Sequence, residues 1–498
     1  MIIEDKQHSF IITCVAFLLL VLGIFFLQND DINRDGVGYL IQANLIEQQQ
    51  QQLAKTLYPN LGFASLILTV RQQLGFGLYQ TAMLLNIIFL LGSLTFFLII
   101  LKQVNSDYRL RVMAIVTVAA SIPLMDTYLT MIIRDHGFWC MSLMGLCCLT
   151  LWMNSKKMIW TLFAYLAFIL AAFFRPEAMA FVVASPFIIL IILLHSGNSL
   201  YVASTHLRQI GILCLIVILG FFMIQGYTEL LANLNMGRYD DIISRPFAAL
   251  QNFTHPLPIE TKDLWLTTLL DDFAFSNKLM LLSNAFLQKW FSSLGVVYFC
   301  LFIFGLKIFN AEKDPHTVII KKLLLGFALL TAGVVLINLW AVYVITVRYL
   351  GLHLWILYFF IAFGLYHIFF NKVYCHRYRR WPYLQKGLVV VLCLMVLNSL
   401  FDKPHVNREK AVADWFARQG IPSNQIFVED LRVRYYMNNL SLAEHSLKDL
   451  DVHDSYGYFV ATNPEAVEFF NKKKYEPIYQ QPIDGEAKII VYKRELLN

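Results

Sequence analysis

Charged residues are scarce in this chain. They make up 15% of its 498 residues, whereas 58% are hydrophobic. Soluble globular proteins contain roughly 25% charged and about 45–50% apolar residues, so a soluble globular protein is excluded. Intrinsic disorder is excluded as well, because disordered chains have low hydrophobicity. With 24 glycines and 14 prolines a collagen-like chain is also excluded, which leaves a multi-pass helical membrane protein.

Cysteine motifs and a nucleic-acid footprint are also missing. The eight cysteines all precede residue 402, mostly within apolar runs, and form no CxxC or Cys/His cluster. They indicate small buried hydrophobic residues rather than disulfides or zinc ligands. Residues 1–401 carry 27 Lys and Arg against 19 Asp and Glu, and residues 402–498 carry 13 against 15. The positive excess therefore belongs to the membrane part, where it sets topology, and no nucleic-acid partner is expected.

Long apolar runs predict the fold. A helix needs about 20 apolar residues to cross the hydrocarbon. The first run is too long for a signal-peptide core and lacks a small-residue cleavage site, so we expect it to be retained as a span. Eleven spans are predicted, over residues 9–27, 78–101, 110–124, 137–152, 158–174, 177–194, 207–225, 288–309, 318–342, 349–370 and 387–401.

Lysine and arginine placement predicts the orientation. Basic residues gather in alternate connections, such as residues 102–111 and 372–386, whereas the turns near 125–136, 174–177 and 343–348 carry one arginine each. Basic connections stay cytoplasmic, so the amino terminus is expected inside and the carboxyl terminus outside. We expect a cell inner membrane location. The predicted domains are a transmembrane part, 1–401, and an extracytoplasmic domain, 402–498.

Three outside segments are long. Residues 28–77 form a first loop, in which 39–57 is helix-compatible and is expected to lie along the membrane surface, with the glutamines at 48–52 on its wet face. Residues 226–287 are long enough to act as a lid. The tail is predicted to be a small α/β domain with helices over 407–419, from 433 and over 464–471, and strands over 425–428, 456–461 and 487–492.

Carboxylates beside the first span are the first candidate site. Asp35 and Tyr39 are four residues apart, so they would share a helix face, and Gly36 and Gly38 allow close approach. A carboxylate at the outer membrane face could act as a general base for a hydroxyl group. Alternatively, it is a solvated residue that caps the following helix. Asp30, Asp31 and Arg34 lie beside it, and the first two are rival carboxylates.

A second carboxylate lies in the next outside turn, where Asp135 precedes His136. These side chains could position an acceptor or, with Asp35, hold a divalent cation such as Mg²⁺ or Mn²⁺. The alternative is an ordinary interfacial turn in which Arg134 pairs with Asp135. Two carboxylates expected at the same membrane face could border one cavity.

Arginines at the same face are the third feature. Arg175 lies in a very short turn before Pro176, and Arg348 precedes Tyr349 at the start of a late span. The planar guanidinium suits phosphate, although the side chain could instead reach to the interface. Arg238 and Arg245 could reach a phosphate from the predicted lid.

These motifs resemble a known superfamily. Asp-Gly-Val-Gly-Tyr-Leu at 35–40 resembles the first-loop motif of the GT-C membrane glycosyltransferases, which include relatives of protein O-mannosyltransferases and of lipid A aminoarabinose transferases. Phe-Arg-Pro-Glu at 174–177 resembles their Arg-Pro-Glu turn, and Arg-Tyr-Leu at 348–350 resembles the Arg-Tyr that opens a late span. Ala-Asp-Trp-Phe at 413–416, with the segments at 426–428 and 430–436, resembles the start of their extracytoplasmic tail.

The resemblance implies a function. GT-C enzymes transfer a sugar from a polyprenyl-phosphate donor to a lipid, glycan or protein acceptor at the non-cytoplasmic face, usually with inversion. It maps the catalytic first-loop carboxylate onto Asp35 and a second acidic residue onto Asp135. The sequence has Asp135-His136 where Asp-x-Asp would stand, which leaves metal dependence open. Two other functions remain: a transporter or flippase of lipid-linked sugars, and a polysaccharide ligase or polymerase.

Overall fold

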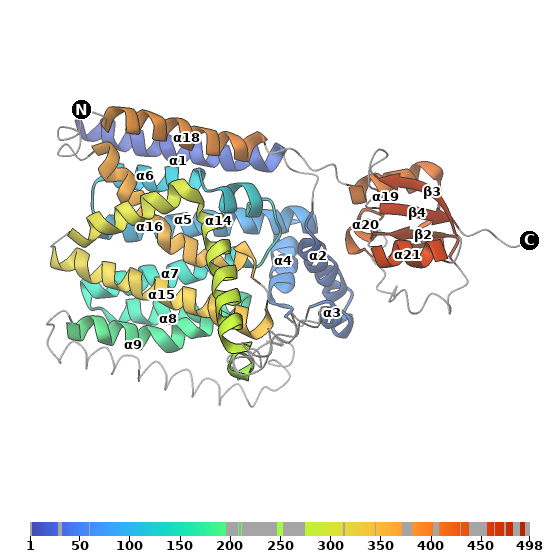
Figure 1. Ribbon diagram of the computed structural model, residues 1–498, viewed down its shortest axis with the longest axis horizontal. Coiled ribbons are helices and arrows are strands. Elements are labelled where there is room, and N and C mark those ends of the chain that lie inside the picture. The colour runs from blue at the N-terminus through green and yellow to red at the C-terminus, as the bar shows by residue number, and fades with distance from the viewer. Residues whose placement is uncertain are drawn as a thin grey trace, which may run out of the picture. The chain divides into compact units, whose positions relative to one another are not determined.

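The computed structural model shows a helical membrane part and a small sheet (Figure 1). It describes residues 2–27, 32–58, 60–195, 208, 211, 247–251, 274–311, 314–343, 345–370, 381–401, 408–428, 430–437, 456–462, 464–472, 475–481 and 489–493. The chain divides into two compact units. The first comprises Met1–Phe25, Met83–Leu129 and Ile133–Asp402, and the second comprises Phe26–Ala82, Thr130–Ile132 and Lys403–Asn498.

The membrane character predicted from composition is confirmed. Within the described residues, seven helices are long and apolar enough to cross a membrane. They are α5 (Leu78–Val104), α7 (Asp135–Ser155), α9 (Met179–His195), α14 (Ala274–Ala311), α15 (Pro315–Val342), α16 (Val347–Phe370) and α18 (Trp381–Phe401). Each coincides with a predicted span.

Three further predicted spans are shorter or bent. The span predicted over 110–124 is a helix, α6 (Tyr108–Ala119), followed by a π-helix, η1 (Ile122–Tyr128), with a 45° bend between them. Pro123 lacks the backbone N–H that would continue the helix, which explains the bend. The apolar parts of α1 (Ile2–Leu27) and α8 (Met158–Phe174) are shorter, and the span predicted over 207–225 lies almost wholly outside the described residues.

Packing in the first unit centres on α7 and α16, which are mostly buried, whereas α18 is mostly exposed. The α7 helix packs on α8, and α16 packs on α14, α6 and α15. Glycines allow α14 and α16 to approach closely, since a Cβ at Gly364 would come within 2.8 Å of the Leu301 carbonyl. In Figure 1 α18 lies along α1, where a Cβ at Gly23 would lie 3.9 Å from Leu400.

The second unit contains the first-loop helices, and here the sequence prediction needs correction. The single helix expected over 39–57 is two helices, α2 (Arg34–Glu47) and α3 (Gln51–Leu57). The first three glutamines form the break between them, with Gln49 in the left-handed region at φ 61°, and the last two begin α3, where they are exposed. A third helix, α4 (Gly62–Leu74), was not predicted.

The tail is an α/β domain, as predicted. Its helices are α19 (Arg408–Gln419), α20 (Leu431–Tyr436) and α21 (Pro464–Lys472), and its strands are β1 (Ile426–Val428), β2 (Tyr458–Ala461), β3 (Glu476–Gln481) and β4 (Ile489–Lys493). The strand order is β1-β2-β4-β3. The β1–β2 pair is parallel, and β4 pairs antiparallel with β2 and β3. The β3 strand was not predicted.

Alternating strand residues cover both faces of this sheet. Ile426 and Val428 point to one face, where they join Val412 and Phe416 of α19 and Val433 of α20 in an apolar core. The residue between them, Phe427, points to the other face and packs with a second core that includes Phe470 of α21. Successive strand side chains point to opposite faces, so helices cover both sides. The predicted boundary at 401/402 between a transmembrane domain and a tail domain stays a prediction.

Candidate active site

Asp35 is half-buried in the first turn of α2. A carboxylate is favoured there by the positive end of the helix dipole. The Tyr58 hydroxyl donates a hydrogen bond to Asp35 Oδ1 at 3.1 Å. Tyr39, one turn further along α2, packs its ring 5.1 Å from that of Tyr58 and 5.1 Å from that of Phe63. The predicted shared face of Asp35 and Tyr39 is therefore occupied by one aromatic partner, Tyr58.

The glycines beside Asp35 make room for the protein itself. A Cβ at Gly38 would collide with the Tyr58 ring, and one at Gly36 would lie 2.9 Å from Ile132 Cβ. Asn33, which precedes α2, exchanges two hydrogen bonds with the Ile132 backbone: its Nδ2 donates to the carbonyl at 3.3 Å and its Oδ1 accepts from the N–H at 2.9 Å. These contacts fix the start of α2 and thereby the position of Asp35.

The protonation state of Tyr58 allows its hydroxyl to donate the hydrogen bond to Asp35. Burial raises the pKa of the Tyr58 hydroxyl above its usual value, and the negative charge of Asp35 raises it further. The phenol therefore stays protonated at neutral pH and keeps donating to the carboxylate. Arg34, the first residue of α2, is exposed.

Asp135 is buried in the first turn of α7, so the expectation that it lies in a loop is corrected. It forms an ion pair with Arg175, whose Nη2 lies 3.3 Å from Glu177 Oε1. Arg175 is 6% exposed, so it does not extend to the interface. The sequence suggested an ion pair between the neighbours Arg134 and Asp135. In the structure Asp135 pairs with Arg175, which is 40 positions away.

The cluster of Asp135, Arg175 and Glu177 contains one positive and two negative side chains. Burial by itself lowers the pKa of Arg175, but the carboxylates of Asp135 and Glu177 raise it above its ordinary value. The guanidinium is therefore permanently charged and faces two acidic groups. Because buried charges are costly unless they are paired, the cluster depends on this arginine. A second anion such as a phosphate would have to compete with both carboxylates for Arg175.

Tyr349 links the two arginines. The Arg175 guanidinium lies 4.5 Å from the centre of the Tyr349 ring, and that of Arg348 lies 5.6 Å from it. Both distances are typical of cation–π contacts. Arg348 and Tyr349 are half-buried. Asp135, Arg175 and Arg348 are far apart in the sequence, and the structure brings their side chains together around Tyr349.

His136 is buried beside this cluster. Its Nε2 lies 2.9 Å from the Tyr128 carbonyl, and its ring packs on Trp139 at 5.0 Å. Within the described residues no group of three or more His, Cys, Asp or Glu side chains could hold a metal ion. Mg²⁺ and Mn²⁺ prefer several oxygen ligands, and the Asp135 carboxylate is paired with the Arg175 guanidinium. A metal role for Asp35, Asp135 and His136 stays a prediction.

Several predicted residues cannot be placed. Asp30, Asp31, Arg238 and Arg245 lie outside the described residues, as does most of the predicted lid over 226–287. Asp35 belongs to the second unit, and Asp135, Arg175 and Arg348 belong to the first.

Two important side chains were missed from the sequence. Tyr58 had no signal, because it lies 23 residues from the carboxylate that it contacts. Gln42 is buried in α2, and its Nε2 donates to the carbonyls of Ala54 at 3.0 Å and Tyr58 at 2.7 Å, which holds Tyr58 in place. Glu177 was seen only as part of a motif, although its position two residues after Arg175 could have suggested the pair.

No protein-family model matches this chain, and no curated protein matches it. The inference of function therefore rests on its own residues and their geometry.

Proposed function

We propose that this protein is a GT-C-like membrane glycosyltransferase. It transfers a sugar from a polyprenyl-phosphate donor to a lipid, glycan or protein acceptor at the outer face of the membrane. The observation that carries the proposal is Asp35: a half-buried carboxylate, fixed in the first turn of α2 and hydrogen-bonded by the Tyr58 phenol. This is the geometry of a positioned general base.

Asp35 takes the proton of the acceptor hydroxyl. The hydroxyl oxygen then attacks the anomeric carbon, the bond from that carbon to the phosphate oxygen breaks, and the electron pair leaves with the phosphate. The sugar is transferred with inversion. Tyr58 holds the carboxylate in position through its hydrogen bond. Because phosphate is a good leaving group, the step requires positive charge near it more than it requires a strong acid.

Arg348 is the stronger candidate for stabilising that phosphate. Its guanidinium is half-buried and stacks on the Tyr349 ring. Arg175 pairs with Asp135 and Glu177. Arg175 and Asp135 then act as positioning residues that hold Tyr349 and, through it, Arg348. His136 supports the same turn through the Tyr128 carbonyl.

The proposed topology has eleven spans, with the amino terminus inside and the tail outside an inner membrane. The distribution of lysine and arginine supports it. A cysteine introduced at Ser455 tests it. We expect an impermeant thiol reagent to label that cysteine in intact cells, and labelling only after lysis would overturn the topology.

Turnover tests the reaction. Purified full-length protein in vesicles is given a polyprenyl-phosphate sugar, and release of polyprenyl phosphate is measured with and without an acceptor. We expect acceptor-dependent release, which Asp35→Asn reduces by roughly 10²- to 10⁴-fold. Asp414→Asn, which changes an exposed carboxylate on α19, serves as the matched control and keeps wild-type turnover. Wild-type turnover in Asp35→Asn would remove Asp35 from the mechanism, and donor binding without release would favour a transporter.

A further inference from the structure

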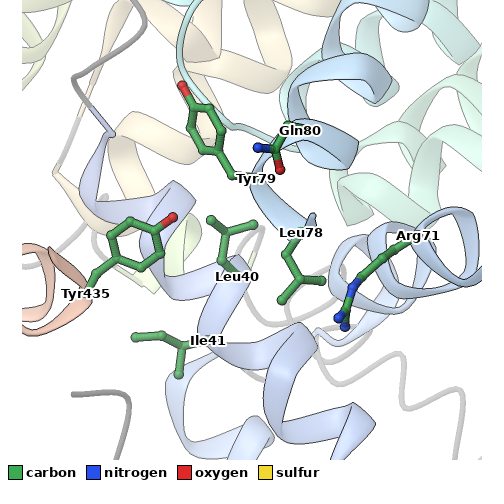
Figure 2. A pocket seen from close by; sticks show the side chains of 7 residues that line it. All are labelled: Leu40, Ile41, Arg71, Leu78, Tyr79, Gln80 and Tyr435. Atoms are coloured by element: carbon green, nitrogen blue, oxygen red, sulfur yellow. The ribbon is translucent and has the colours of Figure 1, made fainter. Parts of the chain in front are cut away.

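A pocket of about 390 Å³ lies in the second unit. Its volume falls within the range of small-molecule sites, about 300–1,000 Å³. Figure 2 shows the lining residues, which come from four helices: Leu40 and Ile41 of α2, Arg71 of α4, Leu78, Tyr79 and Gln80 of α5, and Tyr435 of α20.

The lining separates into apolar and polar parts. In Figure 2 the aliphatic side chains of Leu40, Ile41 and Leu78 lie between Tyr435 on one side and Arg71 on the other, with the Gln80 amide nearby. Hydrocarbon can pack on the three aliphatic residues, and the guanidinium, amide and phenol groups can hydrogen-bond. This division matches an amphiphile, which has a hydrocarbon chain and a polar headgroup.

The pocket lies where a membrane helix begins. Leu78, one of its lining residues, is the first residue of α5, which is apolar enough to cross a membrane. Just before it, Leu74 and Phe76 are each 50% exposed around Gly75, which turns the chain with φ 72°. Exposed apolar side chains next to the start of a span indicate contact with lipid.

Arg71 favours a headgroup with a negative charge. The guanidinium has five N–H donors, and its ion pair with Glu47 runs through Nη1. The side chains of Arg71 and Glu47 are 33% and 38% exposed, and an ion pair this exposed contributes little stability. An anionic headgroup can therefore share or replace Glu47 on Arg71, and phosphate suits the planar guanidinium.

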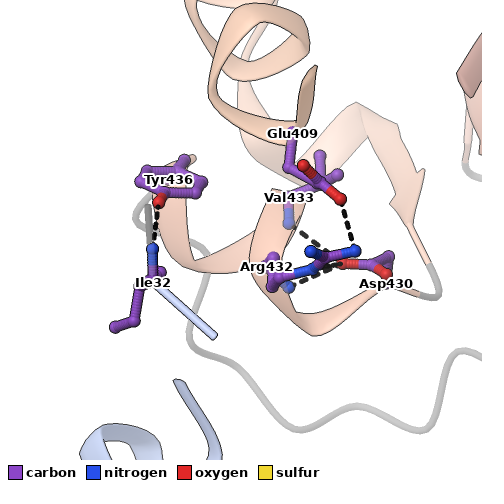
Figure 3. Close-up of polar contacts among 6 residues, drawn as sticks. All are labelled: Ile32, Glu409, Asp430, Arg432, Val433 and Tyr436. Atoms are coloured by element: carbon purple, nitrogen blue, oxygen red, sulfur yellow. Dashed lines mark hydrogen bonds and ion pairs between the residues drawn. The ribbon is translucent and has the colours of Figure 1, made fainter. Parts of the chain in front are cut away.

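The tail completes the pocket through Tyr435. The next residue, Tyr436, accepts a hydrogen bond through its hydroxyl oxygen from the Ile32 backbone N–H at 3.2 Å (Figure 3). Within the tail, α20 is held firmly. Asp430 accepts from the Arg432 N–H at 2.8 Å at the start of the helix, and the Arg432 side chain pairs with Glu409 of α19. A ligand in the pocket would contact both the first loop and the tail.

We propose that this pocket binds a lipid with an anionic headgroup and thereby stabilises the contact between α20 and α2. The proposal goes beyond the glycosyl transfer, and its test uses no sugar donor. A ligand that binds only the folded protein raises its unfolding midpoint.

The experiment follows the thermal unfolding midpoint of the purified full-length protein in neutral detergent micelles. Phosphatidylglycerol, phosphatidylcholine or water-soluble glycerol phosphate is added over a concentration series. We expect phosphatidylglycerol to raise the midpoint at a concentration about tenfold lower than phosphatidylcholine, and tenfold corresponds to about 1.4 kcal/mol. Both lipids carry a phosphate, but only the phosphatidylglycerol headgroup has a net negative charge, because the choline ammonium neutralises the phosphate of phosphatidylcholine. Glycerol phosphate, which lacks a chain, is expected to have no effect.

Two substitutions separate binding from structure. Arg71→Ala is expected to abolish the preference for phosphatidylglycerol, whereas Glu47→Gln, which breaks the same ion pair but leaves the guanidinium, is expected to keep or increase it. Arg418→Ala, an exposed arginine on α19, is the control and keeps the preference. Equal effects of the two lipids on the wild-type protein, an effect of glycerol phosphate alone, or equal losses in Arg71→Ala and Glu47→Gln would each overturn the proposal.

Discussion

The two carboxylates that the sequence singled out have opposite environments. Asp35 is half-buried and accepts a hydrogen bond from a neutral phenol. Asp135 is buried and forms an ion pair with Arg175, which contacts a second carboxylate, Glu177. Both lie in the first turn of a helix, so helix position does not explain the difference. The difference lies in the side chain that contacts each carboxylate, Tyr58 for Asp35 and Arg175 for Asp135.

A general base must be able to accept a proton. Asp35 is half-buried, so an acceptor hydroxyl can reach its carboxylate while the Tyr58 phenol holds it in position. Protonation of Asp135 would weaken the pairing of a buried guanidinium, which is costly. We therefore infer that Asp35 acts in the chemistry and that Asp135 holds structure. Four measurements test this difference between the two carboxylates.

The largest effect is expected for Arg175→Gln. It leaves Asp135 and Glu177 buried without their cation, which should lower the free energy of unfolding by about 3–5 kcal/mol, as measured by denaturation in mixed micelles. Asp35→Asn should change it by less than about 1 kcal/mol. Adding Asp135→Asn to Arg175→Gln should recover part of the loss. Equal stability of Arg175→Gln and the wild-type protein would show that the ion pair between Asp135 and Arg175 does not stabilise the fold.

A smaller effect is expected for Arg348→Gln. If Arg348 stabilises the leaving phosphate, kcat/KM for the polyprenyl-phosphate sugar should fall roughly 100-fold, and Arg348→Lys should restore part of it by keeping the charge. Arg418→Gln is the matched control. An unchanged kcat/KM in Arg348→Gln would show that Arg348 does not stabilise the leaving phosphate.

Tyr58→Phe removes the hydroxyl and keeps the ring that packs on Tyr39. Loss of one hydrogen bond to a carboxylate should lower kcat about tenfold, with the fold intact by circular dichroism. Tyr383→Phe, which changes an exposed tyrosine on α18, should leave kcat unchanged. A wild-type kcat in Tyr58→Phe would show that Asp35 needs no positioning by the phenol.

The smallest effect concerns alkaline stability. Because the pKa of Tyr58 is raised in the folded state, its contribution is complete below the unfolded pKa of about 10 and is lost as the pH rises above that value. At about pH 11 the wild-type protein should lose roughly 1 kcal/mol more stability than Tyr58→Phe. Parallel curves for the two proteins between pH 8 and 11 would indicate that the phenol is not perturbed.

Most of the helical fold was predictable because its signals are local. Apolar runs gave the spans that the structure describes, and the short apolar run Ile426–Val428 gave the first strand of the tail. The errors occurred in the first loop. Gln48 and the next two residues favour a helix by composition, but the chain breaks there. The α4 helix was missed although Phe63, Ala64, Ile67 and Leu68 are spaced as one helix face, which is buried.

The candidate site was predictable by residue type but not by partner. Arg175 and Asp135 were both selected, but their ion pair joins residues 40 positions apart. Tyr58 was not selected, since nothing in its neighbours marks it as the donor to Asp35. Such pairings depend on how the helices pack.

A multi-pass membrane protein with a small α/β tail follows from the order of the residues alone, because the length of an apolar run and the local residue pattern are properties of consecutive residues. The packing of the helices determines that Asp135 is ion-paired with Arg175, that the Tyr58 phenol contacts Asp35, and that four helices line the pocket at Tyr435. These properties depend on distances between residues far apart in the chain, and burial then sets the free energy of each charge.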